Sequence, residues 1–193
     1  MPLSSPFKFA VLSYFHNFES RMKEFNNSLE YTIDYFIIDY SEQDLGTAKL
    51  LREGYDVILI YSTFFHSVKN IGYFAIQIQK TDMDIIQAVL EAREKTREIG
   101  LTIHANENIN IELLEKLCDV SLIPIRYNNI IDLEKNLNTV MASGCRAIVG
   151  GGFSSEVVQN KQDISYFPVE PTSYSLSLIH ISRAHETGAY LVC

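Results

Sequence analysis

The stretch CRAIVGGGFSSEVVQN, Cys145 to Asn160, decides the fold of this chain. It reads as a short apolar strand over 147–149, three consecutive glycines over 150–152 and a helix that opens at Phe153. Glycine lets a strand turn tightly into a helix, whose N-terminus offers unpaired N–H groups and a partial positive charge. A small polar or anionic group is one expected occupant of this turn. The alternative is an ordinary tight turn between strand and helix, because the stretch lacks a complete dinucleotide or phosphate-loop motif.

A counterpart of this stretch occurs 90 residues earlier in the chain. GYDVILIYSTFFHSVKN (54–70) and GCRAIVGGGFSSEVVQN (144–160) both read as glycine, apolar strand, turn and helix. Two further matches have nearly the same offset: Thr81-Asp82 with Thr172-Ser173, and LSYFH at Leu12 with LTIHA at Leu101. Three matches in one order at nearly one offset indicate a tandem duplication of a unit rich in strands and helices.

Composition places the chain among globular proteins and excludes some partners. The 193 residues are 47% hydrophobic and 21% charged, with a net charge of −8. No Lys/Arg block is present, so we expect no direct contact with nucleic acid or an anionic membrane. No signal-peptide pattern or membrane-length apolar run is found, and the three cysteines have no metal-ligand spacing. The expected compartment is the cytoplasm, with free thiols.

Apolar runs alternate with helical patterns along the whole chain. We expect strands over 7–14, 31–39, 56–61, 73–79, 101–104, 120–125, 147–149 and 164–169. Helices are expected over 17–27, 42–52, 81–100, 110–118, 130–143 and 173–190, with shorter ones after the turn at 62–65 and after the glycines at 150–152. This alternation with short connections predicts parallel sheets covered by helices on both faces. The fold class is therefore α/β, a tandem duplication of two three-layer α/β/α lobes with parallel four-stranded sheets.

The duplication also predicts the domain boundaries. The N-terminal lobe is expected over 1–80 and the C-terminal lobe over 81–172, with 58–60 and 147–149 as equivalent central strands. The last helix, 173–192, is expected to pack back on the N-terminal lobe.

Candidate binding residues follow the strands, since parallel α/β sheets bind ligands at the carboxyl ends of their strands. Two lobes in tandem are expected to face these ends toward a shared cleft. The ligand-binding candidates are Ser13, Ser62, Thr63, Phe64, Thr81, Asp82, His104, Asn106, Gly151, Gly152, Phe153, Ser154, Glu170, Thr172 and Ser173. Their hydroxyls and helix-end N–H groups suit neutral hydrogen bonding or carboxylate capture without a catalytic base. Gly152→Val is expected to abolish effector binding, and Ser62→Ala and Thr63→Val to weaken it.

Several candidates have a structural alternative. Thr81 and Ser173 are equally explained as helix caps, and His104 as a structural or solvated histidine. Phe64 and Phe153 are either ligand walls or contacts between the lobes. Phosphate-loop, G-x-S-x-G and H-E-x-x-H motifs are all missing. We therefore predict no catalytic residue, no metal and no cofactor.

The order and spacing of these motifs resemble a known family. The segments 54–70 and GYFAIQIQKTDMDIIQAVLEA (72–92), then GLTIHANE (100–107), GCRAIVGGGFSSEVV (144–158) and the final helix are similar to the N-terminal sensor domain of the propionate-catabolism activators, a family of sigma-54-dependent transcriptional regulators. The resemblance implies a chelatase-like fold that binds a small effector between its lobes, 2-methylcitrate in the propionate regulators. This chain differs in the bulkier turn at 62–65, and Lys80 and Arg126 are the cations expected near a tricarboxylate.

The sequence thus favours a cytoplasmic sensing domain that signals by lobe closure. Its expected partners are a small-molecule effector, for which a carboxylate is one candidate, and attached or separate ATPase and DNA-binding output domains; a homo-oligomer is a further alternative. The competing hypothesis is a small-molecule enzyme that uses the same cleft, with His104 or Glu170 as an acid–base group.

Overall fold

The computed structural model describes residues 8–13, 23, 26, 32–37, 49, 53–61, 74–78, 80–159, 161–172 and 174–175, without the side chains of 61, 74–77, 153 and 159. The chain divides into two compact units. Unit 1 comprises Met1–Thr81 and Pro171–Cys193, and unit 2 comprises Asp82–Glu170.

The sheet of unit 1 has four parallel strands in the order β2-β1-β3-β4. They are β1 (Phe9–Ser13), β2 (Ile33–Ile37), β3 (Val57–Tyr61) and β4 (Phe74–Ile78). The two inner strands are apolar except for Ser13 at the end of β1, and Ile58, Leu59 and Ile60 are almost completely buried. This near-continuous apolar run is typical of a parallel strand that is covered on both faces.

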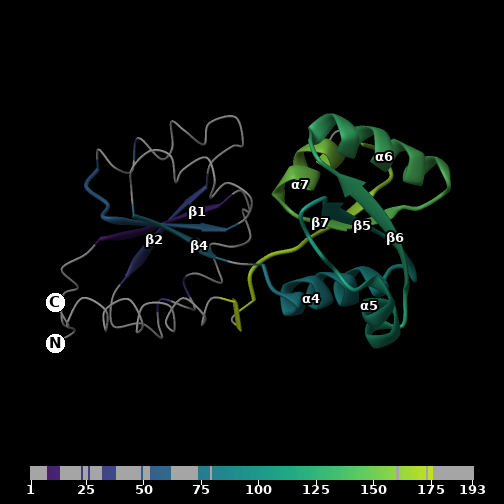
Figure 1. Ribbon diagram of the computed structural model, residues 1–193, viewed down its shortest axis with the longest axis horizontal. Coiled ribbons are helices and arrows are strands. Elements are labelled where there is room, and N and C mark those ends of the chain that lie inside the picture. The colour runs from purple at the N-terminus through teal and green to yellow at the C-terminus, as the bar shows by residue number, and fades with distance from the viewer. Residues whose placement is uncertain are drawn as a thin grey trace. The chain divides into compact units, whose positions relative to one another are not determined.

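Unit 2 repeats this sheet with the order β6-β5-β7-β8, again all parallel. Its strands are β5 (Glu98–His104), β6 (Ser121–Tyr127), β7 (Ala147–Gly150) and β8 (Ser165–Pro168). Its helices are α4 (Asp82–Arg93), α5 (Ile111–Cys118), α6 (Ile130–Ala142) and α7 (Gly152–Gln159). Helices α4 and α5 cover one face and α6 and α7 the other (Figure 1), so unit 2 has three layers and a core on each side of the sheet.

The two sheets confirm the predicted duplication. Strands β3 and β7, which contain 58–60 and 147–149, hold the same position in the strand order of their sheets. Among the described glycines, those with positive φ are Gly54 (φ +80°) and Gly144 (φ +105°), the pair at an offset of 90. Each precedes the equivalent inner strand and occupies a backbone region that glycine enters without strain. The repeat therefore extends to the local backbone conformation.

One predicted boundary is wrong. The helix expected to run to Gly100 ends at Arg93, and β5 begins at Glu98, so Gly100 lies inside a strand. A Cβ atom at Gly100 would lie 2.6 Å from Ile148 Cδ1 and 2.9 Å from Ile125 Cδ1. Gly100 thus makes room for core side chains and does not end a helix.

Most of the other predicted elements occur with ends shifted by one to three residues. For the helices expected over 17–27 and 42–52, the structure describes only Lys23, Asn26 and Lys49, all helical. Tyr174 and Ser175 are helical in the last predicted helix, and residues 176–192 lie outside the described chain.

Tyr55 anchors the edge of the unit 1 sheet. Its hydroxyl donates to Asp34 Oδ2 at 2.6 Å, its ring meets that of Phe36 edge-on at 5.4 Å, and Lys8 Nζ lies 4.0 Å from the ring centroid. Burial, followed by the hydrogen bond to Asp34, raises the pKa of Tyr55 to about 12. The neutral phenol is therefore the form that the folded chain favours.

This raised pKa predicts a loss of stability at high pH. The folded pKa of Tyr55 exceeds the value of about 10 expected for the unfolded chain, so its contribution is complete below pH 10 and is lost as the pH rises to about 12. Urea unfolding across this range should show the decrease in wild type and a smaller one in Tyr55→Phe. Removal of the bond should lower the free energy of unfolding by about 1 kcal/mol at neutral pH. Equal slopes in the two proteins would contradict the assignment.

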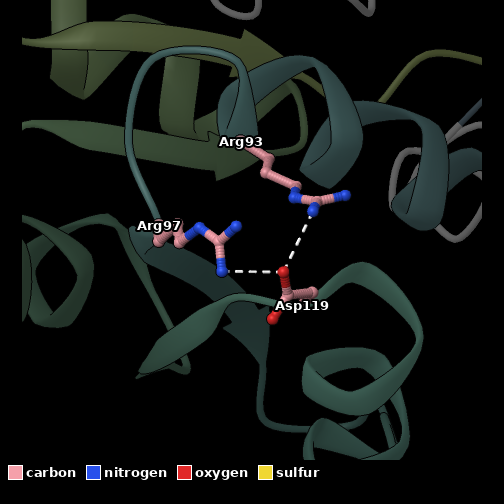
Figure 2. A network of polar contacts seen from close by, with 3 residues as sticks. All are labelled: Arg93, Arg97 and Asp119. Atoms are coloured by element: carbon pink, nitrogen blue, oxygen red, sulfur yellow. Dashed lines mark hydrogen bonds and ion pairs between the residues drawn. The ribbon is translucent and has the colours of Figure 1, made fainter.

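Asp119 joins α4, α5 and the start of β5. Its Oδ2 atom lies 3.0 Å from Arg93 Nη2 and 2.7 Å from Arg97 Nη1 (Figure 2). Asp119 is also the C-cap of α5, with φ 54° and ψ 55° in the left-handed region. Its carboxylate therefore pairs with two cations from a backbone conformation that aspartate and asparagine tolerate better than most residues.

The variant Asp119→Asn removes the two ion pairs but keeps the left-handed backbone conformation, so it measures the contribution of the ion pairs. Asparagine tolerates the same φ, so we expect a loss of about 0.5–1 kcal/mol in the free energy of unfolding, which high salt should reduce. Asp163→Asn is the matched control, because Asp163 has φ 64° and no ion pair in the described chain. Urea unfolding at low and high salt measures both variants. Equal changes in the two, with the same salt dependence, would show that the ion pairs contribute nothing.

Candidate functional site

The glycine turn of unit 2 is held in place by hydrogen bonds to its carbonyl groups. The Gly150 carbonyl accepts the Val169 backbone N–H at 2.8 Å and the Tyr166 hydroxyl at 2.8 Å. The Gly151 carbonyl accepts the Ser154 N–H at 3.0 Å and the same Tyr166 hydroxyl at 2.5 Å. The segment after β8 and the tyrosine within β8 therefore fix the turn that leads into α7.

A hydroxyl cluster, formed by the buried Thr102 and Ser154 and the half-buried Tyr166, lies against this turn. Ser154 is fully buried and Thr102 is 4% exposed, with 2.6 Å between their side-chain oxygens. Thr102 Oγ1 also donates to the Val149 carbonyl at 3.4 Å. The three hydroxyls come from β5, α7 and β8, so the cluster ties the inner strand β5 to the helix and to the edge strand β8.

The chemistry of Tyr166 is set by its surroundings. Burial raises the pKa of Tyr166 well above its usual value, and the neighbouring Tyr127 and Glu170 raise it further, against an opposing hydrogen bond with Ser154. Tyr166 therefore stays protonated and serves as a hydrogen-bond donor to the turn. Glu170, 7% exposed, is close enough for its charge to act on this hydroxyl.

The geometry identifies Gly150 as the glycine that the turn requires. A Cβ atom there would overlap Thr102 Oγ1 and lie 2.6 Å from Ser154 Oγ, whereas a Cβ at Gly151 would have no neighbouring heavy atom within 4 Å. Neither has the positive φ that favours glycine. Gly150 therefore permits close packing of the hydroxyl cluster, while Gly151 faces open space.

His104 lies on the same face of the sheet as Thr102, two residues along β5. It is half-buried, and its ring meets the Tyr127 ring edge-on at 5.3 Å. His104 Nδ1 accepts the Asn106 backbone N–H at 3.3 Å, an arrangement that leaves Nε2 as the donor in the neutral ring. Arg126 is paired with Ile103, so its side chain leaves the opposite face of the sheet.

Two candidates at the end of unit 1 are linked through a residue that the sequence did not single out. Thr81 Oγ1 lies 2.9 Å from Ser175 Oγ, and Thr172 Oγ1 lies 3.4 Å from the same oxygen. Ser175 is buried. Thr81 and Thr172, predicted as counterparts in the repeat, are therefore joined through one serine hydroxyl.

The remaining candidates fall into three groups. Ser13 is buried at the end of β1, and Asp82 is exposed at the start of α4. Gly152 is buried in α7, and the backbone of Phe153 belongs to the same helix. The predictions for Ser62, Thr63, Phe64 and Ser173 lie outside the described residues.

Sequence reasoning thus located Ser154, His104, Gly151 and Glu170 at this edge of unit 2 but missed Thr102 and Tyr166. Strand alternation was the signal that could have found Thr102, since it shares a face with His104. Among the described residues, no group of three or more His, Cys, Asp and Glu side chains could hold a metal ion. No helix in the described chain has the length and apolar character needed to cross a membrane.

Comparison with known proteins agrees with this architecture. A structure of an NtrC family transcriptional regulator from Clostridium acetobutylicum aligns over 96% of this chain and 96% of that chain, with 16% identity and a TM-score of 0.74. At this identity the match shows the fold alone. An ABC transporter solute binding protein from Burkholderia graminis C4D1M, solved with D-arabinose, aligns over 92% of this chain and 80% of that chain at 12% identity. Its TM-score of 0.39 is too low to support a conclusion about this chain.

The comparison with curated proteins finds no match. The family described as propionate catabolism activator matches residues 69–177, more than half of the chain. This range includes β4, the whole of unit 2 and the return of the chain to unit 1. The chain therefore belongs to the propionate catabolism activator family.

Proposed function

We propose that the chain is the effector-sensing domain of a transcriptional activator and that the effector contacts the turn at Gly151. The observation that carries the proposal is the contrast between the two glycines: Gly150 is packed against the hydroxyl cluster, and Gly151 faces open space at the start of α7. The N–H groups of the first turn of α7 would receive the ligand, and the cluster below would hold them in position.

An organic acid is the effector class that we propose. N–H groups and the partial positive charge at a helix N-terminus favour a carboxylate, and His104 Nε2 adds a donor on the same face of the sheet. Glu170 disfavours a second negative charge near Tyr166, which supports a ligand that directs one carboxylate to α7 and hydroxyl or neutral groups toward Glu170. The proposed function includes no catalytic step. We propose that attached or separate ATPase and DNA-binding domains supply the output.

A thermal-shift screen of organic acids tests the binding. A ligand at 100 times its dissociation constant should stabilise the chain by about 2.7 kcal/mol. If the protein converts the stabilising acid into a product, and His104→Ala abolishes this conversion, the result would instead indicate an enzyme. Lobe closure on binding belongs to the proposal as well, and small-angle X-ray scattering with and without the acid should show a smaller radius of gyration in the bound state.

Gly151→Val is the sharpest variant for locating the site. Because Gly151 faces open space and lacks a positive φ, valine should fit the fold, yet its side chain would occupy the place of the ligand. We expect calorimetry on a stabilising acid to show at least a tenfold loss of affinity, with an unchanged circular dichroism spectrum. Gly152→Val is less informative, because Gly152 is buried in α7 and a larger side chain there also disturbs packing. Unchanged affinity in a folded Gly151→Val would place the ligand elsewhere.

A further inference from the structure

Helix α5 has an apolar row that the described chain leaves uncovered. Leu114 and Cys118 are buried against the sheet, whereas Leu113 and Leu117 are 51% and 61% exposed. The two exposed leucines are four residues apart and therefore lie one above the other on the helix surface. Single exposed leucines are common in soluble proteins, so the residues beside this row decide whether it indicates a binding surface.

A charged row of Glu112 and Lys116 runs beside the two leucines. Both side chains are exposed and four residues apart, the spacing of an ion pair within a helix. In the part of the chain that the structure describes, neither side chain has a hydrogen bond or an ion pair. The outer face of α5 thus consists of a leucine row and a row with a negative and a positive end.

We propose that this face, defined by Glu112, Leu113, Lys116 and Leu117, binds a second copy of the chain through an antiparallel pair of α5 helices. A two-fold axis perpendicular to both helices keeps each row on its own side and reverses its direction. Leucine then meets leucine, with Leu113 opposite Leu117 of the second copy, and Glu112 lies opposite Lys116. The surface is complementary to itself in both polarity and charge, as an isologous interface requires.

The parallel alternative lacks this match. A two-fold axis along the helices would place the leucine row of one copy against the charged row of the other, which would bury charges against apolar groups. The leucine row and the charged row of α5 therefore favour a second copy of the chain as the partner and the antiparallel orientation of the two helices. It does not depend on the effector site, so the two proposals can fail separately.

The expected association is weak. Helix α5 has only two turns, and a stable interface usually buries about 800 Å² on each partner. We therefore expect the weight-average sedimentation coefficient of the full chain to rise only at high concentration, between roughly 10 µM and 1 mM.

Charge exchange on α5 tests the geometry by sedimentation velocity. Glu112→Lys and Lys116→Glu should each weaken association about tenfold or more, because like charges then face each other twice. The double variant Glu112→Lys/Lys116→Glu should restore association, since it only reverses each pair. Leu117→Ser should abolish it by interrupting the apolar row.

Controls lie on α6, which covers the opposite face of the sheet (Figure 1). Ile131 is 75% exposed, and Lys135 is exposed and provides the same charge change as Lys116. Ile131→Ser and Lys135→Glu should therefore associate like wild type. The proposal is overturned if wild type shows no dependence on concentration, if Leu117→Ser associates normally, or if the double variant stays monomeric while its circular dichroism spectrum is unchanged.

Discussion

Gly150→Ala should lower the free energy of unfolding by about 1–3 kcal/mol, whereas Gly151→Ala should change it by less than about 0.5 kcal/mol. The two glycines are neighbours in one turn and have the same side-chain change. Only at Gly150 does a Cβ atom overlap Thr102 Oγ1 and approach Ser154 Oγ within 2.6 Å. The added methyl group would have to separate the hydroxyl cluster or displace the end of β7.

Backbone entropy cannot produce this difference. Alanine in place of glycine restricts the unfolded chain equally at both positions and is mildly stabilising where the native φ is negative. Urea unfolding of both variants gives the difference directly, and the near-ultraviolet circular dichroism of the tyrosines reports on the packing of Tyr166. If both variants are as stable as wild type, then Thr102 and Ser154 can move apart freely, and the cluster does not hold the turn.

The fold was predictable where the residues that form the sequence pattern also determine the local backbone conformation. Gly54 and Gly144 precede equivalent strands, and both have the positive φ that makes glycine useful there. The apolar runs at 58–60 and 147–149 are too short and too apolar for surface helices, and they form inner strands of parallel sheets. A duplicated unit carries the same pattern twice, which explains why these two strands were predicted as equivalent strands of two similar sheets.

The boundary at Gly100 failed because tertiary packing overrides local preference. The segment after Arg93 continues with Glu94 and Lys95, which favour a helix, and ends in a glycine that is typical of a helix C-terminus. In the structure, Glu98 already pairs with Ser121 of β6, and Gly100 lies beneath Ile148. Neither partner is near in sequence, so no local pattern could reveal them.

The candidate site shows the same limit. His104 at the end of β5 and Ser154 in the helix after β7 were predicted because a general rule places ligands at the carboxyl ends of parallel strands. Thr102 and Tyr166 lie within strands, and their roles depend on contacts with residues far along the chain: Thr102 meets Ser154, 52 residues later. Such a pair has no sequence signature of its own. It becomes evident only when two strands and a helix are placed together.

Thr102 and Ser154 should behave as a coupled pair in unfolding experiments. Thr102→Val keeps the shape of the side chain but deprives the Ser154 hydroxyl of its 2.6 Å neighbour. A buried hydroxyl that loses a partner destabilises by about 1–3 kcal/mol, and Ser154→Ala should do the same to Thr102. The double variant removes both hydroxyls, so it should be less destabilised than the sum of the two single variants by about 1–2 kcal/mol.

A distant serine provides the control for this cycle. Ser143 Oγ donates to the Val140 carbonyl at 2.7 Å on the exposed end of α6. Ser143→Ala combined with Thr102→Val should therefore be additive within about 0.5 kcal/mol. Additivity in the Thr102–Ser154 cycle as well would mean that the two hydroxyls contribute independently, through the Val149 carbonyl and Tyr166. Of the three hydroxyl side chains, Tyr166 would then be the one that holds the glycine turn, beside the backbone hydrogen bonds from Val169 and Ser154. Tyr166→Phe would therefore be the variant that loosens the turn.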